Sequence, residues 1–425
     1  MVRYRVRGGN VLRGTAFIQG AKNAVLPMIG AALLAAEGQT VLRNVPVIED
    51  VRRAVELAEA VGAKVQFHEA ERTLVIDASQ LTSPVLPAEI ARRFRGSVLF
   101  VPALLHRLGE AIIEGVGGCN LGSRNLDFHY LGYKRLGAVV DEGESVIHIK
   151  AAGLVGAPLY LDTPSHTGTE NLIMAAALAG GTTVIENAAL EPEVLDVIVM
   201  LSRMGARIRG GGTGFITVEG VRELSAVEHT VMPDRLDAGV FAMAAAITGG
   251  EVNLVGASLE HLGVVRWKLE QMGVEFAVDG AVLNVRRDRR LRPINVITDT
   301  YPGFATDLQS PLMTVACLAD GSSYIHERIF DGRFALAGEL NKMGANIEVD
   351  GSRAVVHGAT PLRGTEVTAH DLRSGIALVL AGLCAEGETT IDSGYLIDRG
   401  HAHLAQRMQA LGADVERQIS SFATD

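Results

Sequence analysis

The feature that most constrains the fold of this chain is an internal repeat of six copies. Each copy contains an apolar helix, a glycine turn, a β-type run, a second helix that ends near Gly-Ala, and a further β-type run. The glycines of the turn and those that close the second helix are, in order, Gly38 and Gly62, Gly109 and Gly137, Gly181 and Gly205, Gly250 and Gly273, Gly321 and Gly344, and Gly387 and Gly412. Within each copy the two glycines are 23 to 28 residues apart, so one supersecondary unit is used six times.

The local chemistry of one copy predicts a βαβαββ unit. Glycine after an apolar helix supplies a left-handed C-cap, and runs such as TVLRNV alternate as a half-buried strand does. A period of about 70 residues is longer than that of common solenoids, which favours two lobes of three copies each. We expect residues 22–231 to form the N-terminal lobe, with a cysteine loop near 115–125. Residues 1–21 and 232–425 then form the C-terminal lobe, and a ligand site is expected between the two.

Bulk properties exclude several classes of protein. A formal net charge of −10 argues against a protein that coats nucleic acid or anionic membrane. The three cysteines are too few for a disulfide framework and indicate a reducing compartment. The apolar stretches are too short to span a bilayer, and the first residues lack a signal-peptide core. The sequence predicts a soluble, cytoplasmic protein without membrane insertion.

The second copy has the widest glycine separation, and its surplus falls in the loop GVGGCNLGSRNLDFH. Cys119 lies in this loop, and Arg124 follows five positions later. A thiol in a glycine-rich loop near a cation can have a lowered pKa and act as a nucleophile or acid. The alternative is a small buried hydrophobe. We expect that alternative for Cys317 and Cys384, which lie in apolar helical runs.

Cations recur at matching places in the copies. They are Lys22, Arg95, Arg235 and Arg373 before the first helices, and Arg124, Arg333 and Arg399 in later loops. If these helix starts converge, the cations form a positive pocket suited to a phosphate or carboxylate. The alternative is local pairing of each arginine with a neighbouring acid, namely Asp234, Asp237, Asp371 or Asp398.

Other polar residues carry weaker signals. Asp307 could take a proton from a substrate hydroxyl, or it could cap the helix that follows it. For His129 and His166 the competing interpretation is hydrogen bonding to backbone near the surface, and Glu191 and Glu193 are equally weak. No His/Cys cluster has metal-ligand spacing, and no Walker or dinucleotide glycine motif is present.

Together these residues resemble the enolpyruvyl transferases. The likeness covers nearly the whole chain in a fixed order of segments: GAKNAVLP, FRGSVLF, GGCNLGSRNLDFH, GTENLIMAAALAGGTTVIENAALEPEV, PDRLDAG, FATDLQ, DGRF, DLRSGIALVLAG and IDRGH. The loop with Cys119 is typical of the branch that acts on UDP-N-acetylglucosamine, whereas the branch that acts on shikimate 3-phosphate lacks it. The resemblance implies an α/β fold, an inverted two-domain α/β barrel with three βαβαββ units per domain.

The resemblance also implies a reaction. The sugar 3′-hydroxyl adds to C2 of phosphoenolpyruvate, C3 is protonated, and the resulting ketal loses phosphate. Lobe closure over the cleft, with the Cys119 loop, would exclude water. The expected partners are therefore two small molecules, phosphoenolpyruvate and UDP-N-acetylglucosamine. No cofactor, metal or nucleic acid is implied, and a monomer is expected.

By motif match, the resemblance gives these residues roles. The catalytic residues are Cys119 as acid or covalent partner, Asp307 as base, Lys22 and Arg399. Phosphoenolpyruvate is held by Lys22, Asn23, Arg95, Arg124, Arg373 and Arg399. The UDP-sugar contacts Asn23, Arg95, Arg124, Asn125, Leu126, Asp127, Phe128, His129, Ser165, Asp307 and Ile329. Supporting residues are Arg235, Arg333 and Asp371.

The sequence departs from the family pattern at Asn125, Thr163 and His166, all in the nucleotide-binding region. Two alternatives therefore accompany the main hypothesis: enolpyruvyl transfer to another acceptor, and a non-catalytic paralogue that senses UDP-sugars. Retention of Cys119, Asp307, Lys22 and Arg399 argues against the sensor.

Overall fold

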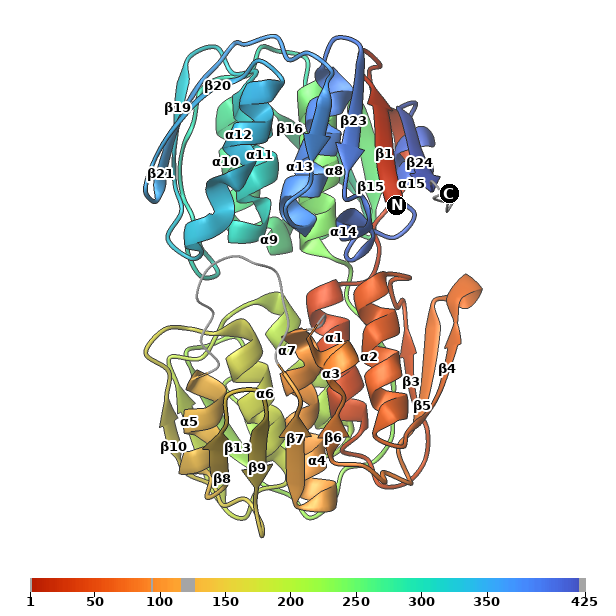
Figure 1. The fold of residues 1–425 in the computed structure, drawn as a ribbon, viewed down its shortest axis with the longest axis vertical. Helices are drawn as coiled ribbons and strands as arrows, with labels where there is room; N and C mark the ends of the chain where they lie inside the picture. Colours follow the sequence, from red (N-terminus) through yellow and green to blue (C-terminus); the bar gives the residue numbers. More distant parts are fainter. Residues whose placement is uncertain (1, 93–94, 116–126, 420–425) are drawn as a thin grey trace. The chain divides into compact units, whose positions relative to one another are not determined.

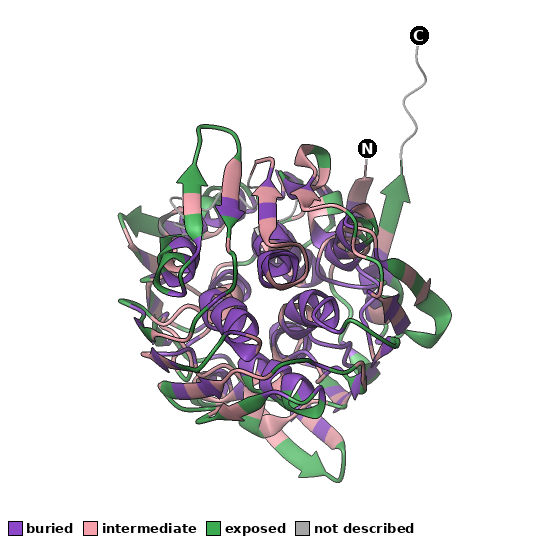
Figure 2. Cartoon of the chain, turned by 90° about the horizontal axis from the view of Figure 1, so that it is seen from below, coloured by how far each residue is buried: buried purple, intermediate pink, exposed green. Residues whose placement is uncertain are grey.

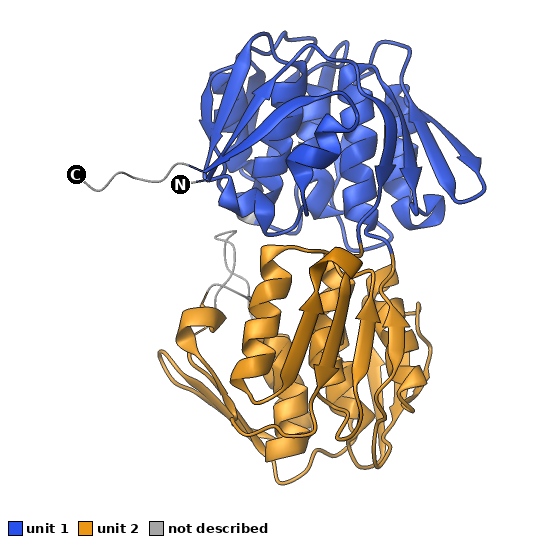
Figure 3. Cartoon of the chain, turned by 90° about the vertical axis from the view of Figure 1, so that its right-hand side faces the viewer, with its two compact units in different colours: residues 1–19, 120–122, 233–425 blue, residues 20–119, 123–232 orange. Residues whose placement is uncertain are grey.

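The chain forms two compact units, each built from three four-stranded sheets and the helices between them (Figures 1 and 3). The computed structural model describes residues 2–92, 95–115 and 127–419. Within these residues, unit 1 holds 2–19 and 233–419, and unit 2 holds 20–92, 95–115 and 127–232.

The three sheets of unit 2 have the orders β14-β3-β5-β4, β6-β7-β9-β8 and β10-β11-β13-β12. Their strands are β3 (Thr40–Arg43), β4 (Lys64–His68), β5 (Thr73–Asp77), β6 (Val85–Leu86), β7 (Glu110–Ile113), β8 (Val139–Glu142), β9 (Ile147–Lys150), β10 (Pro158–Tyr160), β11 (Thr182–Glu186), β12 (Arg207–Arg209), β13 (Phe215–Glu219) and β14 (Glu228–Thr230).

The sheets of unit 1 have the orders β16-β17-β15-β2, β18-β19-β21-β20 and β22-β23-β1-β24. Their strands are β1 (Val2–Arg7), β2 (Arg13–Phe17), β15 (Glu251–Val255), β16 (Glu275–Asp279), β17 (Val282–Arg286), β18 (Asn295–Ile297), β19 (Ser322–His326), β20 (Asn346–Asp350), β21 (Arg353–His357), β22 (Glu366–Thr368), β23 (Glu388–Asp392) and β24 (Asp414–Ile419).

All six sheets share one pattern, in which an edge strand runs parallel to its neighbour and the other pairings are antiparallel. Two sheets borrow their parallel edge strand from a distant part of the chain. β14 pairs with β3 in unit 2, and β2 pairs with β15 in unit 1. β1 completes the sixth sheet between β23 and β24. Within the described residues, the chain passes from unit 1 to unit 2 at residues 19–20 and returns at residues 232–233.

The first helix of each repeat is almost fully buried. In unit 2 these helices are α1 (Lys22–Ala32), α4 (Val101–Leu108) after the 3₁₀ turn η2 (Arg95–Phe100), and α6 (His166–Ala177). In unit 1 they are α8 (Arg235–Thr248), α11 (Gln309–Ala316) after η3 (Thr306–Leu308), and α13 (Leu372–Cys384). α8, α11 and α13 pack against one another, and so do α1, α4 and α6. Figure 2 shows central helices as buried and the strands outside them as partly exposed.

The remaining helices are more amphipathic, because one face meets solvent. They are α2 (Glu49–Ala60), α3 (Ala88–Ala91), α5 (Asp127–Arg135), α7 (Pro192–Arg203), α9 (Leu259–Leu262), α10 (Val264–Met272), α12 (Ala335–Lys342) after η4 (Asp331–Phe334), α14 (Tyr395–Asp398) and α15 (Leu404–Gln409); a further 3₁₀ turn, η1, spans Glu69–Glu71. In α7, for example, Val194, Val197 and Leu201 are buried while Leu195 and Val199 are exposed, which is the spacing expected of one buried face.

The structure confirms the predicted fold class, with βαβαββ repeats in two α/β units. All six glycines that close the second helix have positive φ, between 92° and 110°. The prediction that the mid-repeat glycine caps the first helix holds only for Gly109, the C-cap of α4. In the fourth repeat Gly249, and not Gly250, ends the helix, with φ 66°. Elsewhere the mid-repeat glycine usually lies beyond the helix, as Gly38 does, and turns the chain into the next strand. Among the described residues no helix is both long and apolar enough to cross a membrane.

We expect Gly205→Ala to destabilise unit 2 by about 1–2 kcal/mol, because alanine resists the left-handed backbone at φ 110° although no atom lies near its Cβ. Urea unfolding measures the difference. Gly153→Ala is the matched control, since its Cβ also meets nothing within 4 Å and its φ is not positive; we expect a change within about 0.5 kcal/mol. Equal losses in both variants would contradict the backbone explanation.

Candidate functional site

The strongest polar cluster of unit 1 joins Asp307, Arg333 and Arg373. Asp307 lies in η3, Arg333 in η4 and Arg373 at the start of α13. Arg333 Nη2 donates to Asp307 Oδ1 at 2.7 Å, and Arg373 Nη2 donates to Oδ2 at 2.6 Å. Both arginines are buried, at 3% and 7% exposure. One carboxylate therefore bridges two guanidinium groups from two repeats.

The electrostatics follow from this geometry. Burial alone would raise the pKa of Asp307, but the charges of Arg373 and Arg333 outweigh it and hold that pKa well below its ordinary value. Burial opposes the charge of Arg373, yet Asp307 and Asp234 raise the pKa of its guanidinium. Asp307 and Arg373 are thus both ionised at neutral pH, and each holds the other in its charged form.

Of the two interpretations of Asp307, the structure excludes the helix cap. η3 begins after Ala305 and α11 after Leu308, and neither helix start has a side-chain cap. A carboxylate that sequence reasoning missed supports the region: Glu327 is buried and accepts from Thr306 Oγ1 at 2.9 Å and from Ile329 N at 2.8 Å. It therefore fixes the backbone on either side of the site.

The acids expected to pair with neighbouring arginines have other partners. Asp371 caps α13 through a capping box with Ser374, and Asp234 caps α8. Arg235 lies over the ring of Tyr301, 5.1 Å from its centroid. The guanidinium of Arg373 donates to Asp307, which lies 66 positions away in sequence, while the charges of Asp234 and Asp371 also act on it.

Arg399 ends α14 as its C-cap residue. The following Gly400 packs on α13, because a Cβ there would meet Leu372 Cδ2 at 2.6 Å. The charge of Arg373 also acts on His401. Arg399 is thus carried by a segment that is seated on the start of α13, beside the cluster.

In unit 2 the main polar pair is Lys22 and Asp50. Lys22 is the first residue of α1, and its Nζ lies 2.6 Å from Asp50 Oδ2 in the first turn of α2. Asp50 is buried, at 2% exposure. The interpretation of Lys22 as an ordinary solvated lysine therefore fails. Asn23 follows as the second residue of α1.

Several residues expected to contact the nucleotide lie at the starts of two helices, α5 and α6. Asp127, Phe128 and His129 open α5, and Ser165 caps α6 by accepting from Gly168 N at 3.1 Å. His129 is buried, and its Nδ1 lies 2.6 Å from Asn171 Nδ2. The expected backbone partner near the surface was wrong for His129, because the side chain points into unit 2 and meets another side chain.

His166 lies beside a group of acidic side chains that the sequence analysis did not predict. Its Nε2 lies 3.1 Å from Oε1 of Glu170, which is 1% exposed. Burial would lower the pKa of His166, but Glu170 and the nearby Glu191 and Glu193 raise it to about 10. Burial raises the pKa of Glu170 to about 7, although His166 acts in the opposite direction. The surface interpretation of His166 is thus wrong as well.

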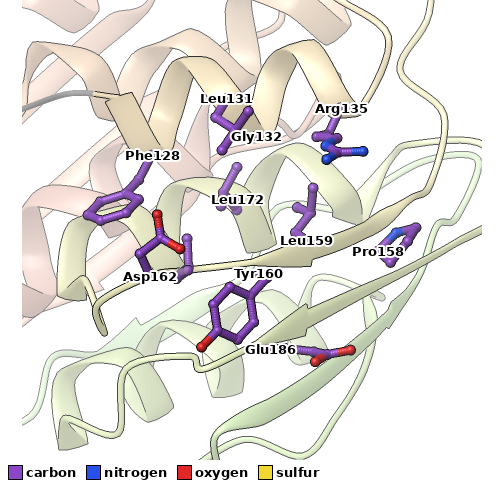
Figure 4. Close-up of a pocket in the computed structure, with 11 residues that line it drawn as sticks. Phe128, Leu131, Gly132, Arg135, Pro158, Leu159, Tyr160, Asp162, Leu172 and Glu186 are labelled. Carbon is purple, nitrogen blue, oxygen red and sulfur yellow. The ribbon is translucent and has the colours of Figure 1, made fainter.

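A cavity of about 360 Å³ lies between α5 and β10 in unit 2 (Figure 4). Its lining residues are Phe128, Leu131, Gly132 and Arg135 from α5, Pro158, Leu159, Tyr160, Leu161 and Asp162 around β10, Leu172 from α6 and Glu186 from β11. Phe128 is the one expected nucleotide contact among them. Asp162 is three residues before Ser165, so the cavity adjoins the region where we expect the UDP group.

Several expected site residues lie outside what the structure describes: Cys119, Arg124, Asn125 and Leu126. Arg95 begins η2, and its side chain is likewise not described. The other two cysteines agree with the sequence interpretation. Cys317 is 1% exposed, and burial raises the pKa of both Cys317 and Cys384 to about 12, which makes them unreactive thiols. In the described part of the chain no three His, Cys, Asp or Glu side chains form a group able to hold a metal ion.

Sequence reasoning missed Asp50, Glu327 and Glu170 as parts of the site. An acid in a helix's first turn, such as Asp50, is usually explained by the helix dipole. Glu170 and Glu327 lie within apolar or β-type runs. The one available signal was a charged residue inside such a run, because burial of a charge requires a partner.

Comparison with known proteins assigns the chain to one family. The family model for EPSP synthase (3-phosphoshikimate 1-carboxyvinyltransferase) matches residues 6–408. The chain therefore belongs to the EPSP synthase family of enolpyruvyl transferases, as its sequence motifs predict.

Two relatives are similar to the chain over nearly its whole length. The chain is 72% identical over 424 residues to UDP-N-acetylglucosamine 1-carboxyvinyltransferase of Thermobifida fusca, covering 98% of each protein. It is 46% identical over 419 residues to UDP-N-acetylglucosamine 1-carboxyvinyltransferase 1 of Symbiobacterium thermophilum, covering 98% of this chain and 95% of that protein.

Two solved structures share the fold. The enolpyruvyl transferase NikO from Streptomyces tendae superposes with a TM-score of 0.88 at 25% identity, covering 99% of both chains. EPSP synthase from Acinetobacter baumannii superposes with a TM-score of 0.78 at 20% identity, covering 99% of this chain and all of that one. The latter likeness shows the fold alone.

The His166–Glu170 pair generates a prediction about pH. The folded-state pKa of His166 is raised from 6.5 to about 10, so its contribution to stability is full below pH 6.5 and is lost as pH rises towards 10. The raised pKa of Glu170, about 7, acts in the same direction at lower pH. We expect the urea midpoint of unit 2 to fall over this range, and His166→Gln to flatten the fall.

His148→Gln is the control, because it removes a histidine that contacts Glu110 at the surface of the same unit, 2.9 Å away. It should leave the pH profile as in the unmodified protein. A wild-type midpoint that stays constant from pH 6.5 to 10 would show that the buried pair does not titrate as stated.

Proposed function

We propose that this protein transfers the enolpyruvyl group of phosphoenolpyruvate to the 3′-hydroxyl of UDP-N-acetylglucosamine and releases phosphate. The observation that carries this is the 72% identity, over 98% of both proteins, to a UDP-N-acetylglucosamine 1-carboxyvinyltransferase. The motif residues of both units are retained with it. Such an activity belongs to the first committed step of peptidoglycan precursor synthesis. It would connect the protein with cell-wall biogenesis, cell shape, the cell cycle and division, in the cytoplasm.

Substrate binding in this proposal depends on charge. Phosphoenolpyruvate and the UDP-sugar are both polyanions, and convergent guanidinium and ammonium groups offset their charge. Unit 1 offers Arg373 and Arg399, and Arg333 shares the Asp307 carboxylate with Arg373. Unit 2 offers Lys22, which Asp50 orients. Arg95 and Arg124 complete the proposed phosphoenolpyruvate set, and the region from Arg124 to His129, with Ser165 and Ile329, is proposed for the UDP group.

The proposed base is Asp307. With its pKa held low by Arg373 and Arg333, the carboxylate is ionised but only weakly basic in the unliganded protein. When an anionic substrate shares those two guanidinium groups, their hold on Asp307 weakens and the nearby negative charge raises its pKa. Substrate binding would therefore strengthen the base at the moment when the 3′-hydroxyl must lose its proton.

The rest of the reaction needs an acid and a leaving group. Protonation of C3 makes C2 of phosphoenolpyruvate electrophilic, and Cys119 is the proposed acid or covalent partner. The oxygen of the sugar then bonds to C2 and gives a tetrahedral ketal. Loss of a proton from C3 together with cleavage of the C2–O bond to phosphate restores the enol ether and releases phosphate.

A second candidate is enolpyruvyl transfer to a different acceptor. The observation that favours it is His166, which departs from the family pattern and is held in a buried ion pair beside Ser165. A sensor without catalysis is the third. Phosphate release with phosphoenolpyruvate and a panel of acceptors separates all three. Release with UDP-N-acetylglucosamine supports the proposal, and release with other acceptors alone supports the second. Nucleotide binding without any release supports the third.

We expect Cys119→Ala to abolish phosphate release while the protein remains folded, because the thiol is the proposed proton donor. Phosphate release is measured with both substrates, and thermal unfolding checks the fold. Cys384→Ala serves as the control, since that thiol is partly buried in α13 with a raised pKa; it should retain activity. Full activity of Cys119→Ala would refute the role of this thiol.

We expect Asp307→Asn to lower kcat by about 10²- to 10⁴-fold, the usual contribution of a general base. The amide keeps the size of the side chain but cannot accept the proton. Asp299→Asn is the control, because Asp299 forms an exposed ion pair with Arg328 at 2.8 Å in the same unit. If both variants turn over at the wild-type rate, Asp307 is not the base.

A further inference from the structure

Gln19 makes a pair of hydrogen bonds that the proposed mechanism does not use. Its side chain is buried, at 4% exposure. Nε2 donates to Gly400 O at 2.8 Å, and Oε1 accepts from Ala402 N at 3.0 Å. One amide thus grips the backbone on both sides of His401, directly after Arg399. The nitrogen and the oxygen of the amide thus each have a hydrogen-bond partner in a buried place.

The backbone of Gln19 is fixed as tightly as its side chain. Its carbonyl accepts from Asp234 N at 2.8 Å, and its own N–H donates to Asp237 Oδ2 at 3.4 Å. Gln19 is the last residue of unit 1 before the first passage between the units, and Asp234 follows the second passage. Gln19 therefore contacts Asp234 through its backbone and the segment that follows Arg399 through its side chain.

A buried ionic group reinforces the same segment. Asp237 is 1% exposed and accepts from Arg407 Nη1 at 3.0 Å, and its Oδ1 lies 3.4 Å from His401 Nδ1. Arg407 Nη2 also donates to Phe17 O at 2.9 Å, two residues before Gln19. Residues 400–407 are thus hydrogen-bonded at two places, to Phe17 and to Gln19, just before the chain enters unit 2.

The segment would not keep this shape by itself. His403 has φ 49° and ψ 38°, a left-handed conformation that a histidine adopts only where the surroundings hold it. Gly400 packs closely on Leu372, because a Cβ at this position would meet Leu372 Cδ2 at 2.6 Å. Since helix α14 has only four residues and ends at Arg399, the position of that arginine depends on what holds residues 400–403.

We propose that Gln19 is a positioning residue for Arg399, which holds the arginine at the start of α13 where phosphoenolpyruvate binds. This inference rests on the proposed function, which assigns Arg399 to phosphoenolpyruvate. The Gln19 side chain supplies both the donor that Gly400 O accepts and the acceptor that Ala402 N needs. A residue without these groups leaves Gly400 O and Ala402 N unpaired, and the segment must move to satisfy them.

The test compares Gln19→Met with the unmodified protein in the phosphate-release assay. Methionine matches glutamine in length but makes neither bond. We expect the KM for phosphoenolpyruvate to rise about tenfold, while the KM for UDP-N-acetylglucosamine changes less than about twofold. Calorimetric titration with phosphoenolpyruvate should show the same loss of affinity. Gln409→Met is the matched control, because Gln409 Nε2 donates to Val415 O at 2.7 Å in the same unit, away from residues 399–403.

The outcomes separate the two proposals. A wild-type protein that releases no phosphate overturns the proposed function and this inference with it. An active wild type and an unchanged KM in a folded Gln19→Met variant overturn the role of Gln19 alone. An equal rise in KM for both substrates, or in Gln409→Met, also overturns it, since it indicates general destabilisation. If Gln19→Met does not fold, Gln19→Asn, whose shorter amide cannot reach both partners, is judged by the same criteria.

Discussion

The candidate site of unit 1 depends on one interaction, in which the Asp307 carboxylate accepts hydrogen bonds from two buried guanidinium groups. Arg333 and Arg373 could not be buried without a shared counter-charge, because desolvating two cations is costly. The bridge joins the fifth repeat to the sixth. The same constraint appears in unit 2, where Lys22 and Asp50 join two helices of the first repeat. In both places a charged side chain that we propose for the chemistry also joins two elements of the fold.

The repeat explains how such pairs arise. Each βαβαββ unit buries its first helix, and the residues at the start of that helix cannot be satisfied by their own helix. The side chain of the N-cap residue supplies missing partners at three of these starts: Asp371 at α13, Asp234 at α8 and Ser165 at α6. Charged side chains at these starts become candidates for binding anions. Gln19 extends this logic to a loop, because its amide satisfies backbone groups that no regular element reaches.

Most of the fold was predictable, because glycine spacing and apolar periodicity are local signals. The six closing glycines all adopt the left-handed conformation that the sequence predicts. The predicted turn at Gly250 was displaced by one residue, since two adjacent glycines offer the same freedom. Among the site residues, motif matching pointed to Lys22, Asp307, Arg333 and Arg373, but it did not predict that Asp307 bridges the two arginines, and it missed Asp50. Asp50 lies 28 positions from Lys22, and only folding brings the two together.

The sequence by itself determined the repeat, the class of fold and the family, because these depend on residue type at fixed spacing. It also determined which cations and which thiol are candidates for chemistry. The tertiary structure alone decided which charges pair, that His129 and His166 point inward, and that Gln19 holds the segment after Arg399. The reason is physical: a long-range contact depends on the burial and geometry of both partners. The residues next to one partner in the sequence do not determine where the other partner lies.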